Sequence, residues 1–226
     1  MQERALHSKP QIKICGLSTP ETLEAAIGFG ADLVGFVFFA PSPRNLTLDQ
    51  AQALAQQVAG RAQKVALSVD AKDDDLRAII AHMQPDLLQL HGQESPERLR
   101  DIRQKFGLPV MKAIGISTRA DLARLSDYAT VSDHLLFDAK MPKDSVLPGG
   151  NGRTFDWSIL QDLQLEKPWM LSGGLDATNV AEAIRQTGAP AVDVSSGVES
   201  APGIKDINKL REFIAALRPL HAKHMP

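Results

Sequence analysis

Eight short apolar runs recur along this chain at fairly regular intervals, and each is followed by a polar segment with helical periodicity. The runs are almost continuously apolar, as expected for parallel strands that are covered on both faces. We expect strands at residues 11–15, 32–39, 64–69, 87–90, 110–114, 134–137, 169–171 and 191–194. The repetition predicts an α/β fold built around a parallel sheet.

The segments between these runs carry helix signals. Ser18 or Thr19 precedes Pro20, and Ser95 precedes Pro96, which are favourable N-cap and first-turn residues. Glycines mark the turns that separate the units. We expect helices at residues 20–29, 48–58, 74–82, 96–106, 119–128, 157–163, 178–187 and 207–217.

Eight strand–helix units in 226 residues fit a single closed (β/α)8 TIM barrel, which commonly uses about 200 to 250 residues as one domain. We expect a short arm at residues 1–9, the barrel at 10–220 and a tail at 221–226. A doubly wound open sheet is the alternative. The even spacing of the units, with no G-x-G-x-x-G sequence after the first strand, favours the barrel.

Charge and composition narrow the classes of partner. A net charge of −2 without a Lys/Arg cluster gives no basis for binding nucleic acid. No run approaches the roughly 20 apolar residues that cross a bilayer, and the N-terminus lacks the apolar centre of a secretory signal. With a single cysteine, these features favour a cytoplasmic protein. A monomer is the expected state.

In a (β/α)8 barrel the reactive groups lie at the carboxyl ends of the strands. Cys15 ends the first predicted strand and, without a second cysteine, forms no internal disulfide. It is either a small buried hydrophobe or a thiol placed for acid–base or nucleophilic chemistry. Asp138 follows the sixth strand, where partial desolvation suits it to a general acid, although it could instead cap a loop or pair with Lys140.

Other candidates have two interpretations as well. Arg44, in a loop after the second strand, could bind a carboxylate through two nitrogens or lie solvated on the surface. His91, after the fourth strand, could contact a ligand or have a structural role. The histidines lack paired metal-ligand spacing, so no metal is expected.

Small residues follow the last two strands. Phosphate sites of such barrels often lie there, because glycine-rich turns direct backbone N–H groups at an anion. The candidate phosphate-binding residues are Gly173, Gly174, Ser195, Ser196 and Gly197. We therefore expect a phosphorylated small molecule as the ligand, and no nucleotide or nicotinamide fingerprint is present.

Several motifs together resemble the phosphoribosylanthranilate isomerase family of tryptophan biosynthesis, in that family's order. They are Lys13-Ile14-Cys15-Gly16, Val34-Gly35-Phe36-Val37-Phe38, Ser42-Pro43-Arg44, Gln89-Leu90-His91-Gly92, Phe155-Asp156-Trp157, Leu171-Ser172-Gly173-Gly174-Leu175 and Val192-Asp193-Val194-Ser195-Ser196-Gly197-Val198-Glu199. They extend from about Ile12 to Phe213. The segment 65–70 and Ala40 depart from the family's usual pattern.

The resemblance implies a cofactor-free Amadori rearrangement of N-(5-phosphoribosyl)anthranilate to an open-chain 1-amino-1-deoxyribulose phosphate. It implies that Cys15 is the general base, Asp138 the general acid and Arg44 the ligand of the anthranilate carboxylate, with the glycine-serine loops on the phosphate. We also expect the loop 141–153 to close over substrate. Another phosphosugar-barrel enzyme, or a non-catalytic binder of phosphorylated ligands, is the alternative.

Overall fold

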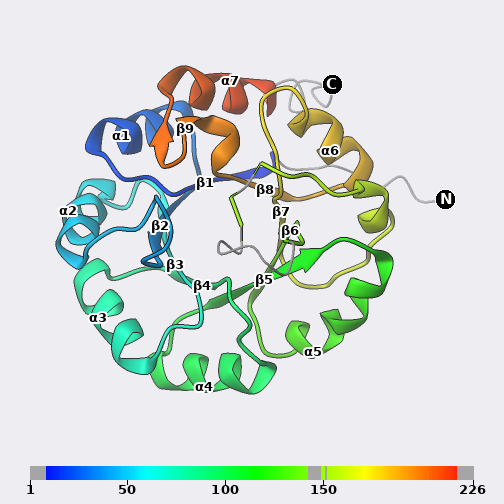
Figure 1. Cartoon of the computed structure of the whole chain (residues 1–226), viewed down its shortest axis with the longest axis horizontal. Helices are drawn as coiled ribbons and strands as arrows, with labels where there is room; N and C mark the ends of the chain where they lie inside the picture. Colours follow the sequence, from blue (N-terminus) through cyan, green and yellow to red (C-terminus); the bar gives the residue numbers. More distant parts are fainter. Residues whose placement is uncertain (1–8, 142–148, 151, 218–226) are drawn as a thin grey trace.

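Eight parallel strands close into a barrel, and a ring of helices surrounds it (Figure 1). The computed structural model describes residues 9–141, 149, 150 and 152–217. The strands follow one another around the barrel in sequence order, and β8 pairs with β1 to close it. The TIM-barrel prediction is confirmed, and the open-sheet alternative is wrong. Residues 1–8 of the expected arm and the expected tail lie outside the described residues.

The strands and helices have the following bounds. The barrel strands are β1 (Gln11–Cys15), β2 (Leu33–Phe38), β3 (Gln63–Ser68), β4 (Leu87–Leu90), β5 (Val110–Ile116), β6 (His134–Ala139), β7 (Trp169–Leu171) and β8 (Ala191–Val194). A small antiparallel pair follows, formed by β9 (Glu199–Ala201) and β10 (Ile204–Lys205). The α-helices are α1 (Pro20–Phe29), α2 (Leu48–Val58), α3 (Asp73–Met83), α4 (Pro96–Phe106), α5 (Leu125–Ala129), α6 (Val180–Thr187) and α7 (Ile207–Leu217). Short 3₁₀ helices are η1 (Arg119–Arg124), η2 (Trp157–Leu160) and η3 (Ser196–Val198).

Two predicted helices differ from the structure. The segment 119–128 is divided into η1 and the five-residue α5. The segment 157–163 contains only η2, because Gln161 has a non-helical ψ of 135° and Asp162 has a left-handed φ of 61°, which turn the chain out of the helix. Helical periodicity in a short window does not separate one turn of 3₁₀ helix from a longer α-helix.

One strand boundary changes the description of the site. The sixth strand continues to Ala139, so Asp138 lies within β6 instead of following it, and it pairs with Gly115 of β5. The pairing with β5 therefore holds the Asp138 backbone along one edge of β6. A residue within a strand has less freedom than one in a loop, which suits a group that must point accurately.

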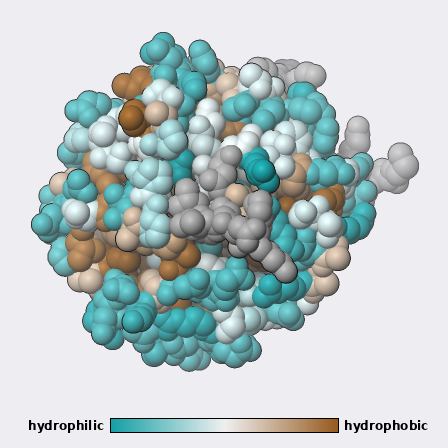
Figure 2. Space-filling view, viewed as in Figure 1, coloured by the Kyte–Doolittle hydropathy of each residue, from teal (hydrophilic) through white to brown (hydrophobic). Residues whose placement is uncertain are grey.

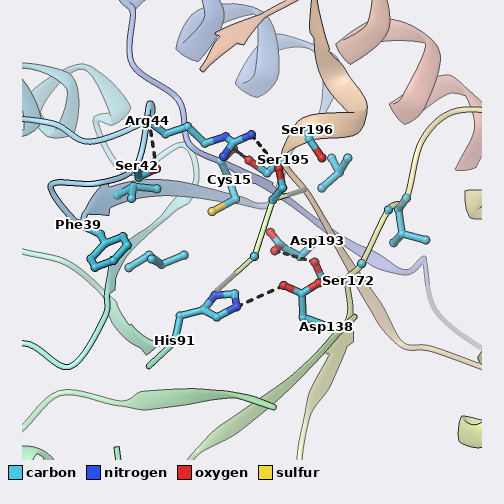
Figure 3. A pocket seen from close by; sticks show the side chains of 18 of the residues that line it. Cys15, Phe39, Ser42, Arg44, His91, Asp138, Ser172, Asp193, Ser195 and Ser196 are labelled. Carbon is cyan, nitrogen blue, oxygen red and sulfur yellow. Dashed lines mark hydrogen bonds and ion pairs between the residues drawn. The ribbon is translucent and has the colours of Figure 1, made fainter. Parts of the chain in front are cut away.

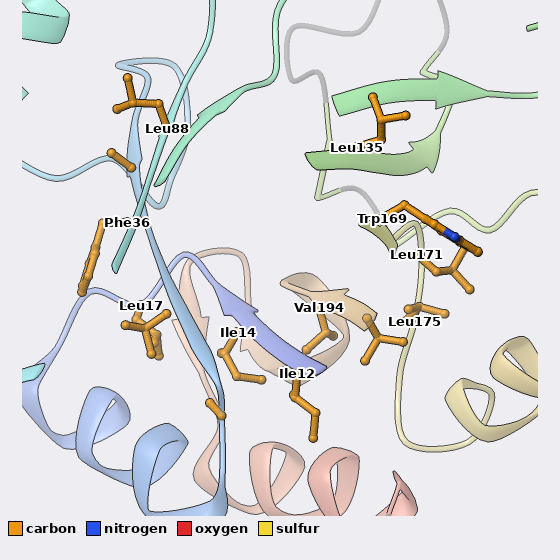
Figure 4. Close-up of a cluster of buried hydrophobic side chains, with 14 of the residues drawn as sticks. Ile12, Ile14, Leu17, Phe36, Leu88, Leu135, Trp169, Leu171, Leu175 and Val194 are labelled. Atoms are coloured by element: carbon orange, nitrogen blue, oxygen red, sulfur yellow. The ribbon is translucent and has the colours of Figure 1, made fainter. Parts of the chain in front are cut away.

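Alternation along the strands sorts side chains into two apolar layers. Ile12, Ile14 and Phe36 belong to the layer between the strands and the helices (Figure 4). The alternate positions point into the barrel, where an inner cluster contains Leu33, Val65, Leu87, Met111, Ala113, Leu136, Met170 and Ala191. Because the side-chain period of a strand is two, Lys13 and Cys15 share the inward face of β1. Asp138 lies two residues after Leu136 on β6, and Asp193 lies two residues after Ala191 on β8, so both also face inward.

The outer ring is largely hydrophilic on the face shown in Figure 2, above all over α4. Within the described residues, the exposed large hydrophobic side chains are Ile204 and Ile207. No helix in the same ranges is long and apolar enough to span a bilayer.

An aspartate clamp recurs at the amino-terminal end of the barrel. The residue before β2 is Asp32, whose carboxylate accepts the N–H of Ile12 at 2.9 Å while its own N–H donates to the Ile12 carbonyl. Asp86 before β4 and Asp133 before β6 repeat both bonds, with Lys64 on β3 and Val110 on β5. Each aspartate therefore fixes the register between an odd strand and the next even strand.

We expect Asp32→Ala to lower the free energy of unfolding by about 1–3 kcal/mol, because it leaves the Ile12 N–H without an acceptor. Asp32→Asn keeps a carbonyl oxygen and is the matched control. Denaturant unfolding measures both. Equal stabilities of the Ala and Asn variants would show that the clamp does not stabilise the barrel.

Candidate active site

A pocket opens at the carboxyl end of the strands, and most predicted site residues line it (Figure 3). Its polar lining consists of Cys15, Ser42, Arg44, His91, Asp138, Ser172, Asp193, Ser195 and Ser196, with the backbones of Gly173 and Gly174. Val37, Phe39, Leu67 and Val69 form an apolar side contributed by β2 and β3 and the loops after them. Of the predicted set, only Gly197 lies behind the lining rather than in it.

Cys15 lies at the end of β1 with 4% of its surface exposed. It packs against Val37 and Leu67, as a buried hydrophobe would, yet it also lines the polar pocket. Burial raises the pKa of the Cys15 thiol; the positive charge of Lys13 opposes this rise, and the negative charge of Asp193 adds to it. In the free protein the neutral thiol is therefore favoured.

Asp138 lies beside His91 and not beside Lys140. Its Oδ2 is 3.2 Å from Nε2 of His91, and its Oδ1 accepts the N–H of Ala139 at 2.8 Å. The alternative in which Lys140 pairs with Asp138 is wrong, because the Lys140 ammonium binds Asp121. The second ring nitrogen of His91, Nδ1, lies 3.2 Å from Nε2 of the buried Gln89. Both imidazole nitrogens thus have protein partners.

Arg44 is buried, so its interpretation as a solvated surface arginine is wrong. Its Nε and Nη2 both donate at 2.7 Å to the two carboxylate oxygens of Glu199, the first residue of β9. Lys205 also donates to Glu199 at 2.7 Å. Burial alone would raise the pKa of Glu199, but the hydrogen bond from Arg44 and the charge of Lys205 lower it. The buried acid is therefore ionised and holds one edge of the guanidinium.

Arg44 lines the pocket, and its Nη2 also donates to the carbonyl oxygen of Gly150 at 3.2 Å. A Cβ atom on Gly150 would lie 2.7 Å from Nη1 of Arg44, and one on Gly149 would lie 2.5 Å from Oδ2 of Asp138. These glycines of the predicted closing loop therefore approach the polar groups as bare backbone. The remainder of that prediction falls on residues 142–148 and 151, outside the described residues.

The last two strands end in loops that interlock through glycine. Gly173 and Gly174 have left-handed φ values of 88° and 60°, a region that favours glycine. A Cβ atom on Gly173 would lie 2.7 Å from the amide nitrogen of Ala139. A Cβ atom on Gly197 would overlap the carbonyl oxygen of Leu175. The loop after β8 therefore packs directly on the backbone of the loop after β7.

Two buried ion pairs at this site were not predicted from the sequence. Lys13 and Asp193 form one of them at 2.8 Å, and Arg44 with Glu199 forms the other. All four residues stand in the quoted motifs, but only Arg44 was a site candidate. The available signal was a charged residue inside an otherwise apolar strand, as for Lys13 and Asp193.

Comparison with known proteins identifies the family. The family model for N-(5'phosphoribosyl)anthranilate (PRA) isomerase matches residues 12–216. The chain belongs to this family. A relative from Bradyrhizobium sp. (strain ORS 278), named N-(5'-phosphoribosyl)anthranilate isomerase, is 59% identical over 207 residues, which cover 92% of this chain and 94% of the relative. The match excludes the alternative of another phosphosugar-barrel enzyme, and the activity is that of an isomerase in tryptophan biosynthesis.

Solved structures agree with the assignment. The phosphoribosyl anthranilate isomerase of Thermotoga maritima has a TM-score of 0.84 and is 33% identical, and the match covers 93% of this chain and 99% of that one. A second structure holds phosphoribosyl anthranilate isomerase in complex with reduced 1-(o-carboxyphenylamino)-1-deoxyribulose 5-phosphate. It has a TM-score of 0.80 and 31% identity, and the match covers 93% of this chain and 99% of that one.

We expect Gly197→Ala to lower the free energy of unfolding by about 1–3 kcal/mol, because the methyl group forces apart two packed loops. Gly28→Ala in α1 is the matched control. Nothing lies within 4 Å of the added methyl group, and alanine favours the helix by about 0.5–1 kcal/mol. Thermal unfolding of both variants checks the prediction, and a Gly197→Ala protein as stable as the wild type would contradict it.

Proposed function

We propose that the pocket at the barrel mouth carries out the family reaction by acid–base catalysis with its own side chains. The substrate is N-(5'-phosphoribosyl)anthranilate, and the product is 1-(2-carboxyphenylamino)-1-deoxyribulose 5-phosphate. The observation that supports this most directly is that Cys15 and Asp138 lie on different sides of one pocket (Figure 3). An Amadori rearrangement needs a proton donor and a proton acceptor at different atoms of one sugar.

Asp138 is the proposed general acid. Protonation of the furanose ring oxygen opens the sugar to a Schiff base, which requires a proton on a group inside the pocket. The contact between Asp138 and Nε2 of His91 accommodates one shared proton. When Asp138 carries it, Nε2 must accept and Nδ1 must donate.

Gln89 is placed to support that tautomer of His91. Its Oε1 is buried and has no hydrogen-bond partner among the described residues, while its Nε2 faces Nδ1 of His91. The two ends of an amide are assigned from the hydrogen-bond network. With the amide turned over, Oε1 would accept from Nδ1–H, and Nε2 of His91 would be free to accept from Asp138.

Cys15 is the proposed general base. It removes the proton from C2′ of the Schiff base and leaves an enolamine, which becomes the ketone product when its C1′ carbon gains a proton and its C2′ hydroxyl loses one. The thiolate is the form that accepts this proton. Because the pKa of Cys15 is raised, the fraction of active base increases with pH above neutrality.

The remaining groups bind the two ends of the substrate. Nη1 of Arg44 has no hydrogen-bond partner among the described residues and faces the pocket, so it is available to the anthranilate carboxylate. The apolar side formed by Val37, Phe39, Leu67 and Val69 suits the aromatic ring. The loops after β7 and β8 are the proposed phosphate site, with Gly173, Gly174, Ser195, Ser196 and Gly197.

Two further assignments stay predictions. We place the enzyme in the cytoplasm and take it to be a monomer. Only Ile204 and Ile207 are exposed large hydrophobic residues in the described ranges, which gives little apolar surface for a subunit interface. One Thermotoga maritima structure concerns monomers generated from a dimeric phosphoribosylanthranilate isomerase, so relatives include dimers.

We expect Cys15→Ser and Asp138→Asn each to lower kcat/KM by about 10²-fold or more, because each removes one proton-transfer group. The assay follows the loss of anthranilate-type fluorescence with freshly prepared substrate. Asp74→Asn, an exposed carboxylate on α3, is the control and retains activity. Wild-type inactivity on authentic substrate would indicate a non-catalytic binder, and full activity of a folded Cys15→Ser protein would remove the thiol from catalysis.

Arg44→Ala is expected to raise KM more than it lowers kcat, because it removes a contact made equally in the ground state and the transition state. Arg77→Ala on α3 removes an exposed arginine and is the matched control. Steady-state kinetics on both variants, with circular dichroism to confirm folding, decide the result. An unchanged KM in folded Arg44→Ala would exclude Arg44 from the carboxylate site.

A further inference from the structure

Lys13 is fully buried inside the barrel, directly below the mouth. Its side chain is 0% exposed, and it points inward from β1 two residues before Cys15. Removing an ammonium group from water is costly unless a counter-charge and hydrogen bonds replace the water. Asp193 of β8 supplies both, with Oδ1 2.8 Å from the Lys13 nitrogen.

The same ammonium borders the thiol. A Cβ atom on Gly35 would lie 3.1 Å from Sγ of Cys15 and 3.3 Å from Nζ of Lys13, so the two atoms share the space that this glycine leaves empty. Gly35 of β2 pairs directly with Cys15 in the barrel register. The absence of a side chain at Gly35 therefore lets the ammonium and the thiol approach the same point.

Charged residues of three strands contribute to the electrostatic surroundings of Cys15. Lys13 on β1 and Lys205 on β10 place positive charge near it, and Asp193 on β8 places negative charge there. Arg44 lies against Gly16, and His91 and Asp138 line the same pocket. Lys205 and Arg44 are both bound to Glu199. Lys13 is the cation whose nitrogen borders the same space as the Cys15 sulfur, beside Gly35.

Lys13 is held in its charged form. Burial alone would lower its pKa, but the charge of Asp193 and the hydrogen bond to it raise the pKa above its ordinary value. Asp193 is itself held by Lys13 on Oδ1 and by the hydroxyl of Ser172 at 3.3 Å on Oδ2. The ammonium therefore stays in position when the thiol loses or regains its proton.

A role in stability alone does not account for the pair. Replacing a buried ion pair with well-packed apolar residues is often neutral or stabilising, and this barrel fills many of its inner positions with Leu33, Val65, Leu136 and similar residues. The charged pair occurs at the level just below the thiol. Its place matches Cys15, which has to become an anion to act as the base.

We infer that Lys13 is a positioning residue that favours the thiolate of Cys15, and that Asp193 competes with the thiolate for the Lys13 ammonium, so that without the Asp193 charge the thiolate becomes its counter-ion. The inference rests on the proposed role of Cys15 as the base. It requires that the loss of Lys13 and the loss of the Asp193 charge have opposite effects on formation of the thiolate. Loss of Lys13 makes the thiolate harder to form, and loss of the Asp193 charge makes it easier.

The experiment uses the fact that Cys15 is the only cysteine of the chain. Thiolate ultraviolet absorbance and the rate of alkylation by iodoacetamide, each measured against pH in the full-length protein, then report on this residue alone. We expect Lys13→Met to lower the alkylation rate at pH 8 by about tenfold, which corresponds to a shift of about one pH unit in the midpoint. Asp193→Asn shifts the midpoint in the opposite direction.

Folding and charge are controlled separately. Lys13→Arg keeps the positive charge, so we expect its thiol midpoint to lie near that of the wild type. The double variant Lys13→Met/Asp193→Asn removes both charges of the pair, so that neither is left buried without its partner. We expect its thiol midpoint to lie at a higher pH than that of the Asp193→Asn protein. Circular dichroism selects the folded variants. Equal midpoints in wild type, Asp193→Asn and the double variant would overturn the inference.

Activity measurements separate the inference from the proposed function. If both hold, the pH at which kcat rises moves with the thiol midpoint in Asp193→Asn. If folded Cys15→Ser is fully active while the thiol midpoints shift as expected, the assignment of Cys15 as the base fails and the coupling to Lys13 stands. If Cys15→Ser is inactive and the midpoints do not move, the inference alone fails.

Discussion

Closure of eight parallel strands into a barrel sends alternate side chains into an enclosed interior, and the rest of the structure depends on this constraint. Apolar residues such as Leu33, Leu136 and Ala191 fill the lower levels of that interior. At the upper end the same inward positions carry Cys15, Asp138 and Asp193. Because the period of a strand is two, the alternation that builds the core also directs the reactive groups into the mouth.

Burial of charge follows from the same enclosure. A polar group inside the barrel must find its partner on another strand or loop, since water does not reach it. Lys13 forms an ion pair with Asp193, and Arg44 forms one with Glu199. Each pair leaves one charged group at the pocket with a defined orientation. The pairs therefore orient the site, and they also set the local charge that governs proton transfer at Cys15.

Much of the fold was predictable because it depends on local patterns. Continuous apolar runs indicated all eight strands, and N-cap residues such as Thr19 and Ser95 placed helix starts where α1 and α4 begin. Predictions weakened where a segment was short. Helix 157–163 became the four-residue η2, and the sixth strand extended through Asp138, because strand pairing with β5 decided where it ended.

The sequence alone determined the order of the strands, the residues at their ends and the family motifs, since these depend on neighbouring residues and on spacing along the chain. Only the tertiary structure decided which partner each charged residue has. Lys13 and Asp193 are 180 positions apart, and Arg44 and Glu199 are 155 positions apart. Closure of the barrel brings β8 against β1, and that contact, together with burial, sets the charge surrounding Cys15. The local sequence does not show which distant residues come into contact, so the ease with which the thiol loses its proton is a property of the closed barrel.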